Sequence, residues 1–350
     1  MAIDWSSLPS DLLRRIGDHH LAAGDIDCYM DMRSVCNSWR SAISKPRPLG
    51  AGADLRFRPR QWVMLDEKES QEAADGRRLF VNVSTGRFLR RRVPMLHDHH
   101  LLAASHGLLV LREKSYPHTT RILDPFTGST LVRAPDVRED DGMNMMTVYF
   151  VPDPGSELRA VQFPHYSEDR IMYYVHSVVT YAGHVYVVDS EGCMFRILGG
   201  EERPSFGYGD LIARMDFGGG MYLVESAGEL LLVRLHHAGG AAEVYRVDVE
   251  RKVVESLPSI GSRALFLGSK CLSVDADKFV AIDPNCVYHT GFSFGDGFLP
   301  WLAAHRYDLG NGGEQEDVSD DLDVNTEDRL VGPPSLVKVL LDYCNLLADQ

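Results

Sequence analysis

The hydrophobic positions near the start of the chain repeat with the spacing of a helix. Leu8 is followed by apolar side chains four, five and eight positions later, at Leu12, Leu13 and Ile16. They share one stripe of a helix that Pro9 can begin, because proline is well tolerated in a first helical turn. The pattern predicts an amphipathic helix.

Two further helices are predicted before Pro46. Asp25 can cap a second short helix after the stretch from Gly17 to Gly24. A third set of side chains then repeats at helical spacing, namely Met32, Val35, Cys36, Trp39 and Ile43. Three such short helices cannot bury all of these side chains among themselves. We therefore expect another chain, or the rest of this protein, to cover part of their surface.

From about Trp62 the pattern changes to short β-rich runs separated by glycine, proline, aspartate and serine, which is typical of many short strands. Three segments share the order strand, Asn or Asp, turn, strand, proline. Their anchors Asn82, Asp124 and Asp248 are 42 and 124 residues apart. This spacing fits the first, second and fifth copies of a unit with the period of a propeller blade, and Tyr307-Asp308-Leu309-Gly310 is a diverged copy.

A second series of turns runs between these anchors, at Gly155, Gly192, Gly228 and Ser269, which are 37, 36 and 41 residues apart. Two interleaved series at one period predict a four-stranded unit repeated around an axis. The expected fold is therefore mainly β, a β-propeller of about six or seven four-stranded blades, preceded by a small three-helix domain.

The helical region resembles the F-box pattern. The match consists of Leu8-Pro9-Ser10-Asp11-Leu12-Leu13, then Ile16 and Leu21, then Val35-Cys36-Asn37-Ser38-Trp39-Arg40. The resemblance implies docking to the Skp adaptor of a cullin-based ubiquitin ligase, with a helix-in-groove contact. The adaptor-binding candidates carried over are Leu8, Pro9, Leu12, Leu13, Ile16, Val35, Cys36 and Trp39.

The remaining region resembles plant F-box proteins that carry a kelch-like, KIB-type β-propeller. The residues that match are Arg56 to Leu65, Leu123 to Gly128, Phe266 to Ser269, and Asp283-Pro284-Asn285-Cys286-Val287-Tyr288. Family members often end on a closing strand, whereas Leu336 to Leu341 has the pattern of an amphipathic helix. The expected organisation is an F-box at 1–48, a linker at 49–61, a propeller at 62–332 with an acidic, disordered loop at 314–328, and a C-terminal helix or tail at 333–350.

The net charge and the cysteine content indicate which classes of partner and which cellular compartments are expected. The formal net charge of -14 disfavours nucleic acid and anionic membrane surfaces. The six cysteines form no CxxC pair, and the chain starts without a basic and then apolar leader, so we expect reduced thiols and an intracellular protein in the cytoplasm, the nucleus or both. No apolar run approaches the roughly 20 residues that span a bilayer.

Residues that could carry chemistry are scattered. His97-Asp98-His99-His100 is the densest group of metal-ligand types, but neighbours on a strand point to opposite faces, so we expect a polar turn before the strand at Leu101. The triplet Gly218 to Gly220 precedes a strand and is predicted to be a flexible turn, and Cys271 is predicted to be a small buried residue. The basic run from Arg87 to Arg92 is expected at a solvated strand edge. We predict no catalytic, cofactor or metal site.

The leading hypothesis is a non-catalytic substrate-recognition adaptor of an SCF-type (Skp, cullin, F-box) E3 ubiquitin ligase. Its F-box would dock the Skp adaptor and through it a cullin, while the loops of the propeller capture a target protein. One alternative is an interaction protein that sequesters or inhibits a partner without assembling a ligase. Another is an enzyme that uses the central channel of the propeller, for which the sequence identifies no convergent set of polar residues.

Overall fold

The computed structural model divides the chain into two compact units. The first comprises Met1–Glu139 and Val148–Ala160, and the second comprises Asp140–Thr147 and Val161–Gln350. The structure describes residues 8–50, 53–65, 76–105, 107–116, 118–132, 145–150, 159–164, 175–197, 209–216, 219–236, 241–268, 270–293, 301–310, 315–317 and 336–345.

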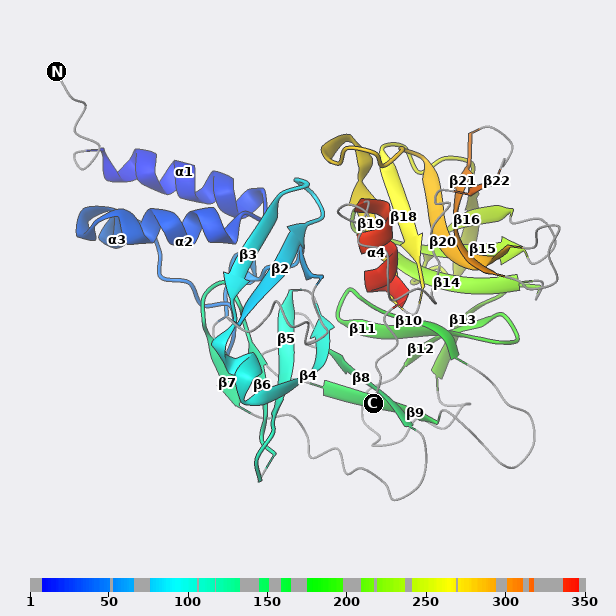
Figure 1. The fold of residues 1–350 in the computed structure, drawn as a ribbon, viewed down its shortest axis with the longest axis horizontal. Coiled ribbons are helices and arrows are strands. Elements are labelled where there is room, and N and C mark those ends of the chain that lie inside the picture. Colours follow the sequence, from blue (N-terminus) through cyan, green and yellow to red (C-terminus); the bar gives the residue numbers. More distant parts are fainter. Residues whose placement is uncertain are drawn as a thin grey trace. The chain divides into compact units, whose positions relative to one another are not determined.

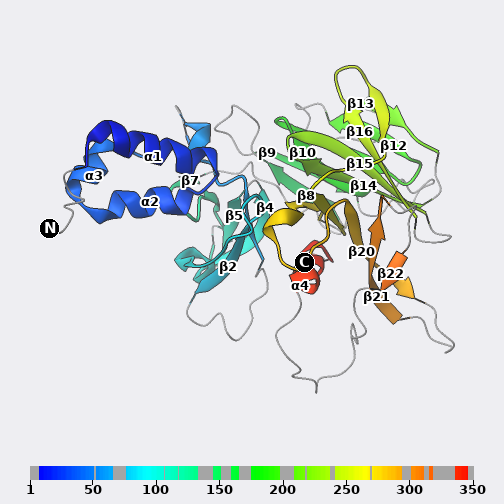
Figure 2. The same cartoon turned by 90° about the horizontal axis from the view of Figure 1, so that it is seen from above.

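The first unit begins with a helical module made of α1 (Ser10–Ala22), α2 (Ile26–Val35) and α3 (Asn37–Ala42). Figures 1 and 2 show α1 and α2 side by side. The helix α1 does not end before Gly17 but extends to Ala22. It continues through this buried glycine, where a Cβ atom would lie 3.0 Å from the Tyr29 ring, so the absence of a side chain lets α2 approach.

The residues of the expected third helix are divided between the end of α2 and α3. Val35 ends α2, and Cys36 adopts an extended conformation with φ -160° and ψ 170°. The Cys36 Sγ then accepts a hydrogen bond from the Trp39 amide at 3.4 Å and so caps α3. The helical spacing from Met32 to Ile43 is uninterrupted and did not predict this break. The break is formed by a capping residue, and no proline or glycine marks it in the sequence.

Two antiparallel sheets follow in the first unit. The first sheet has three strands in sequence order, and its members are β1 (Trp62–Met64), β2 (Arg77–Asn82) and β3 (Phe88–Arg92). The second has four strands, namely β4 (His99–Ser105), β5 (Leu108–Glu113), β6 (Thr120–Leu123) and β7 (Thr130–Val132). Short 3-10 turns lie at Leu55–Phe57 and Pro94–His97. The helices and these sheets share one buried cluster, which joins Leu13 and Ile26 to Trp62, Phe80 and Phe126.

A two-stranded sheet is formed by β8 (Met145–Phe150) and β9 (Arg159–Pro164). The second unit then contains two four-stranded antiparallel sheets. Their strands are β10 (Val175–Tyr181), β11 (His184–Asp189), β12 (Cys193–Ile197) and β13 (Gly209–Arg214), then β14 (Gly219–Ser226), β15 (Glu229–His236), β16 (Ala242–Asp248) and β17 (Val253–Leu257).

The last sheet has five strands in the order β19-β18-β20-β21-β22, with β18 and β20 parallel. They are β18 (Arg263–Leu267), β19 (Leu272–Asp275), β20 (Cys286–Ser293), β21 (Trp301–Asp308) and β22 (Gln315–Asp317). A 3-10 turn covers Ala276–Lys278. The predicted C-terminal helix is confirmed as α4 (Leu336–Asn345), which packs on β18 and β20. Its Cys344 carbonyl accepts a hydrogen bond from the Lys270 amide at 2.9 Å.

The expected mainly β propeller is confirmed, but the expected number of blades is not. Within the described residues, five sheets have three or more strands, and three of these have four. The prediction of six or seven blades assumed that every blade has the same length in the sequence. The last sheet alone runs from Arg263 to Asp317 with five strands, while β8 and β9 make a sheet of only two. No helix in the part of the chain that the structure describes is long and apolar enough to cross a membrane.

The two predicted series of turns fare differently. Asn82, Asp124 and Asp248 each precede the last strand of their sheet, so the first series is confirmed. In the second series, Gly192 lies between the second and third strands of its sheet, whereas Gly228 lies between the first and second of the next. These turns are not equivalent, and that series is wrong. Its first and last members, Gly155 and Ser269, lie outside the described residues.

Candidate functional site

The eight residues that sequence analysis selected on the helical module fall into exposed and packed groups. Leu12 and Ile16, one turn apart on α1, are 40% and 42% exposed, and Val35 at the end of α2 is 59% exposed. These are large aliphatic side chains held at the surface by regular helix. We call Leu12, Ile16 and Val35 the exposed apolar set.

The other selected residues are occupied within the protein or lie at helix ends. Leu13 is only 1% exposed and belongs to the core, and Leu8 and Trp39 are half-buried against that core. Cys36 caps α3, and Pro9 is the exposed N-cap of α1. Helical spacing alone grouped Leu12 with Leu13, whereas the structure separates a surface residue from a core residue.

Backbone carbonyls at the end of α3 are held by side chains of the other two helices. Arg33 Nη1 on α2 donates to the carbonyls of Ile43 and Ser44, both at 2.8 Å. The Tyr29 hydroxyl donates to Ser44 O at 2.9 Å, and Arg14 Nε on α1 donates to Ala42 O at 3.1 Å. Hydrogen bonds from charged donors to helix-end carbonyls fix the short α3 against α1 and α2. No local pattern in the sequence marks these side chains.

The turn between α1 and α2 is anchored to the first sheet. Trp62 Nε1 donates to the Gly24 carbonyl at 2.9 Å, and Asn82 Nδ2 lies 3.4 Å from Asp25 Oδ1. Gly24 adopts φ +71°, a conformation that glycine reaches without strain. The first sheet therefore contacts a backbone carbonyl and a side chain of the turn, and Gly24 has a backbone conformation that favours glycine.

Arg87, just before β3, completes this junction. Its guanidinium contacts the buried Asp27 carboxylate, donates to Cys28 Sγ at 2.8 Å and lies 3.6 Å from Asp25 Oδ1. It also lies over the Trp62 ring, 6.0 Å from the centroid. The expectation that the basic run is a solvated strand edge is therefore wrong for Arg87.

The same correction applies to Arg91 within that run. Arg91 donates to the carbonyls of Pro125 and Phe126 at 2.7 Å and 2.6 Å, while Arg90 and Arg92 are exposed on β3 as expected. Arginine donates through a planar fork of five N–H groups, so it can serve several buried acceptors at once. That use of an arginine depends on the fold and cannot be read from a run of basic letters.

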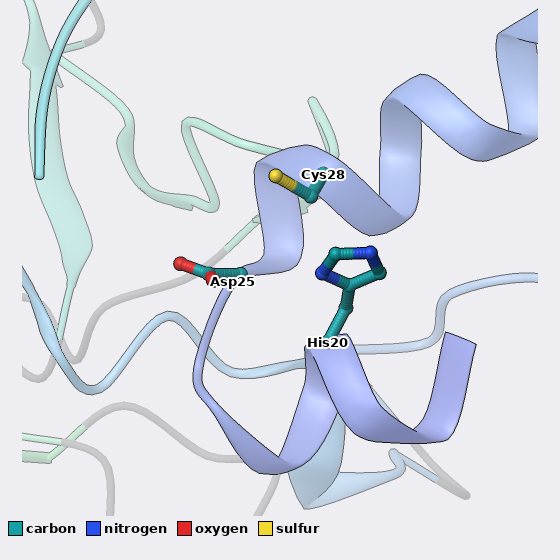
Figure 3. Close-up of side chains that lie close together, drawn as sticks. All are labelled: His20, Asp25 and Cys28. Carbon is teal, nitrogen blue, oxygen red and sulfur yellow. The ribbon is translucent and has the colours of Figure 1, made fainter. Parts of the chain in front are cut away.

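A mixed group of side chains surrounds the α1–α2 turn. One ligand atom from each of His20, Asp25 and Cys28 lies within 4.8 Å of the others. Figure 3 shows the three side chains close together, with His20 at the end of α1 and the other two at the start of α2. Burial raises the pKa of the Asp25 carboxyl and of the Cys28 thiol, and the nearby Asp27 charge raises both further. The group combines the nitrogen, oxygen and sulfur donors that suit a metal ion.

The segment His97-Asp98-His99-His100, which has the highest density of metal-ligand residue types in the sequence, does not bring three of its side chains together as potential metal ligands. His97 Nδ1 pairs with Asp98 Oδ1 at 2.7 Å on the surface, whereas His99 Nδ1 lies 3.0 Å from the Met95 carbonyl in a half-buried position. Within the described residues the only group of three or more potential metal ligands is the one at His20, which sequence analysis missed.

Two other sequence features occupy structural positions. Gly219 and Gly220 lie within β14 and not in a turn, and a Cβ on Gly219 would meet the Leu235 carbonyl oxygen at 1.5 Å, so glycine permits close strand pairing there. Cys271 lies at the edge of the core of the last sheets. Burial raises the pKa of its thiol to about 11, so it is protonated at neutral pH and is a poor nucleophile.

Comparisons with known proteins identify the β-rich region. A family model described as the KIB1-4 beta-propeller matches residues 80–319. No curated protein matches the chain. Among solved structures, one titled "YCF48 bound to D1 peptide" is 10% identical, covers 73% of this chain and 80% of its own, and superposes with a TM-score of 0.29, too low to support any argument. Because the family model spans more than half of the sequence, the chain belongs to the KIB1-4 β-propeller family.

Proposed function

We propose that this protein is the substrate-recognition adaptor of an SCF-type E3 ubiquitin ligase. In this proposal the helical module is an F-box that docks a Skp adaptor and through it a cullin, and the propeller captures a target protein. The protein itself makes and breaks no bond. It would work where cullin ligases work, in the cytoplasm or the nucleus.

The observation that carries the proposal is the exposed apolar set. Leu12, Ile16 and Val35 keep much of their surface in water although the neighbouring Leu13 is fully buried. Burying a fully exposed aliphatic side chain contributes about 1.5–3 kcal/mol. Leu12, Ile16 and Val35 are 40–59% exposed, so a partner groove that covers them gains roughly half of that from each. An amphipathic helix that places its apolar face in a groove is a recurrent mode of recognition.

The anchored turn supports the proposal from a second direction. Trp62, Asn82 and Arg87 hold the α1–α2 turn on the first sheet through the contacts described above. A ligase adaptor works by tethering, which raises the effective concentration of the target near the ubiquitin-charged enzyme. The effective concentration depends on geometry, so a helical module fixed to its neighbouring sheet suits this role better than one on a loose linker.

The decisive experiment is a pull-down with a purified Skp adaptor and cullin. The intact chain is compared with Leu12→Asp/Ile16→Asp, which places two charges in the exposed apolar set and leaves the core intact. The matched control is Leu211→Asp/Val253→Asp, which changes two similarly exposed aliphatic residues on β13 and β17. Circular dichroism first establishes that all three proteins are folded.

We expect the intact chain and the control to bind, and the Leu12→Asp/Ile16→Asp variant to lose binding. Binding that survives in this variant would show that the exposed apolar set is not the contact. No binding by the intact, folded chain would contradict the ligase proposal. It would leave a protein that sequesters its partner through the propeller.

A further inference from the structure

His20, Asp25 and Cys28 come together at the turn between α1 and α2. His20 lies in the last turn of α1, Asp25 is the N-cap residue of α2, and Cys28 lies in the first turn of α2. The Asp25 amide donates to the His20 carbonyl at 2.8 Å, which closes the turn and brings the helix ends together. A side chain from each position then reaches the same space, as Figure 3 shows.

The donor set is chemically selective. Imidazole nitrogen, carboxylate oxygen and thiolate sulfur are the three ligand types of protein zinc sites. Hard cations such as Mg²⁺ and Ca²⁺ prefer oxygen ligands alone, so a set with nitrogen and sulfur favours a divalent transition metal. Three protein ligands leave a fourth tetrahedral position for water or a partner's side chain.

The charges around the group favour an added cation. Asp25 and Asp27 together carry one more negative charge than Arg87 neutralises. The Asp27 side chain is only 4% exposed, and its Oδ1 has no hydrogen-bond partner among the described residues. A divalent cation that displaces the Cys28 thiol proton would bring this group to neutrality.

Arg87 is compatible with such an ion. It approaches Cys28 from the first sheet and donates to the sulfur, and it keeps Asp27 as its main partner. A metal-bound thiolate retains lone pairs that accept N–H donors, and outer hydrogen bonds of this kind orient metal ligands. Arg87 would therefore hold Cys28 in place from outside the coordination sphere.

We propose that His20, Asp25 and Cys28 form a binding site for a divalent transition-metal ion of the zinc type. Binding deprotonates Cys28, and the released proton passes to solvent. The ion links the end of α1 to the start of α2 and so stabilises the turn that Trp62 and Asn82 hold. The site would exist whether or not the helical module docks a ligase adaptor.

Cobalt is the probe for the test, because Co²⁺ occupies zinc-type sites and gives a near-ultraviolet charge-transfer band when it binds thiolate. The full-length protein is kept reduced and titrated with Co²⁺. We expect the band to appear, to disappear in Cys28→Ser, and to require about tenfold or more Co²⁺ in His20→Ala and Asp25→Asn. The matched controls are His19→Ala, one position away on α1, and Cys36→Ser, the other half-exposed thiol of the helical module.

The melting temperature is a second readout, which distinguishes a variant that has lost the metal site from one that is misfolded. Zn²⁺ should raise the melting temperature of the intact protein and of both controls, but not that of the three ligand variants, since only a folded site that binds metal gains stability from it. The absence of a band in the folded intact protein would overturn the proposal. A band of equal strength in Cys28→Ser would overturn it as well.

Discussion

The guanidinium of Arg87 forms an ion pair with the buried carboxylate of Asp27, and this pair joins the first sheet to the first turn of α2. The partners are 60 residues apart in the chain. Asp27 is shielded from water while Arg87 remains about one third exposed, so the carboxylate depends on this partner more than the guanidinium does. The pair therefore links the helical module electrostatically to its sheet.

We expect Arg87→Gln to lower the free energy of unfolding by about 2–4 kcal/mol, because it leaves the Asp27 charge buried without compensation. The measurement is urea denaturation followed by circular dichroism. In Asp27→Asn/Arg87→Gln the stranded charge is absent, so the double variant should lose less than the sum of the two single losses. Additive losses would show that the two side chains do not depend on each other.

The neighbouring leucines of α1 should behave in opposite ways. Leu13→Ala should destabilise the protein by about 2–5 kcal/mol because it opens a cavity in the shared core. Leu12→Ala should change stability by no more than about 0.5 kcal/mol, as expected for a surface position. Thermal and urea unfolding of the two variants measure the contrast. Equal losses would place Leu12 in the core and remove it from the exposed apolar set.

Features that depend on local hydrogen bonds could be predicted from the sequence. The turn after each confirmed anchor is one in which the side-chain oxygen accepts amides two and three residues later. Asn82 Oδ1 accepts from Ser84 and Thr85, Asp124 Oδ1 from Phe126 and Thr127, and Asp248 Oδ1 from Glu250 and Arg251. Asn and Asp favour this turn through their short polar side chains, so the residue type and the geometry occur together.

The second series of turns failed for a related reason. The turn equivalent to Ala227-Gly228 is Ala182-Gly183, 45 residues earlier, since both join the first and second strands of a four-stranded sheet. In both turns the alanine as well as the glycine has positive φ. Alanine rarely adopts this conformation, so its presence gave no turn signal and the nearby Gly192 was paired with Gly228 instead.

The candidate site was only half predictable. Helical spacing predicted that the helical module carries apolar side chains on a helix face, because periodicity reflects which residues share a face. It could not separate Leu12 from Leu13, since spacing alone does not show which of the two faces the core. The contacts of Arg87 with Asp27 and Cys28 link segments far apart in the chain and leave no mark on local patterning.

Asp124 allows a test of a buried charge. Burial raises the pKa of its carboxyl to about 6, against the opposing effect of the Phe126 and Thr127 amides. A carboxyl whose pKa is raised by folding stabilises the native state below pH 4 and loses that contribution as the pH rises through about 6. Asn82 performs the same turn without a charge. Asp124→Asn should therefore stabilise the protein by about 1–3 kcal/mol at pH 7 and have little effect near pH 4.

The comparison for Asp124→Asn is chemical unfolding at the two pH values. Asp124→Ala serves as the control, because it removes the charge together with the acceptor for both amides and should destabilise the protein at each pH. If Asp124→Asn weakened the protein at pH 7, the buried carboxylate would be a net source of stability, contrary to its raised pKa.

His289 on β20 and His305 on β21 face each other as a cross-strand pair with ring centroids 5.2 Å apart. Burial, with a smaller contribution from the neighbouring His305, lowers the pKa of His289 to about 4. A histidine whose pKa is lowered by folding supports the native state while it is neutral, so this contribution is lost as the pH falls from about 6.5 towards 4. The shift corresponds to a loss of about 3 kcal/mol across that window. Urea unfolding of the intact protein should show this loss, His289→Gln should reduce it, and the exposed His184→Gln should leave it unchanged. The same pH dependence in His289→Gln would mean that the acid sensitivity lies elsewhere in the protein.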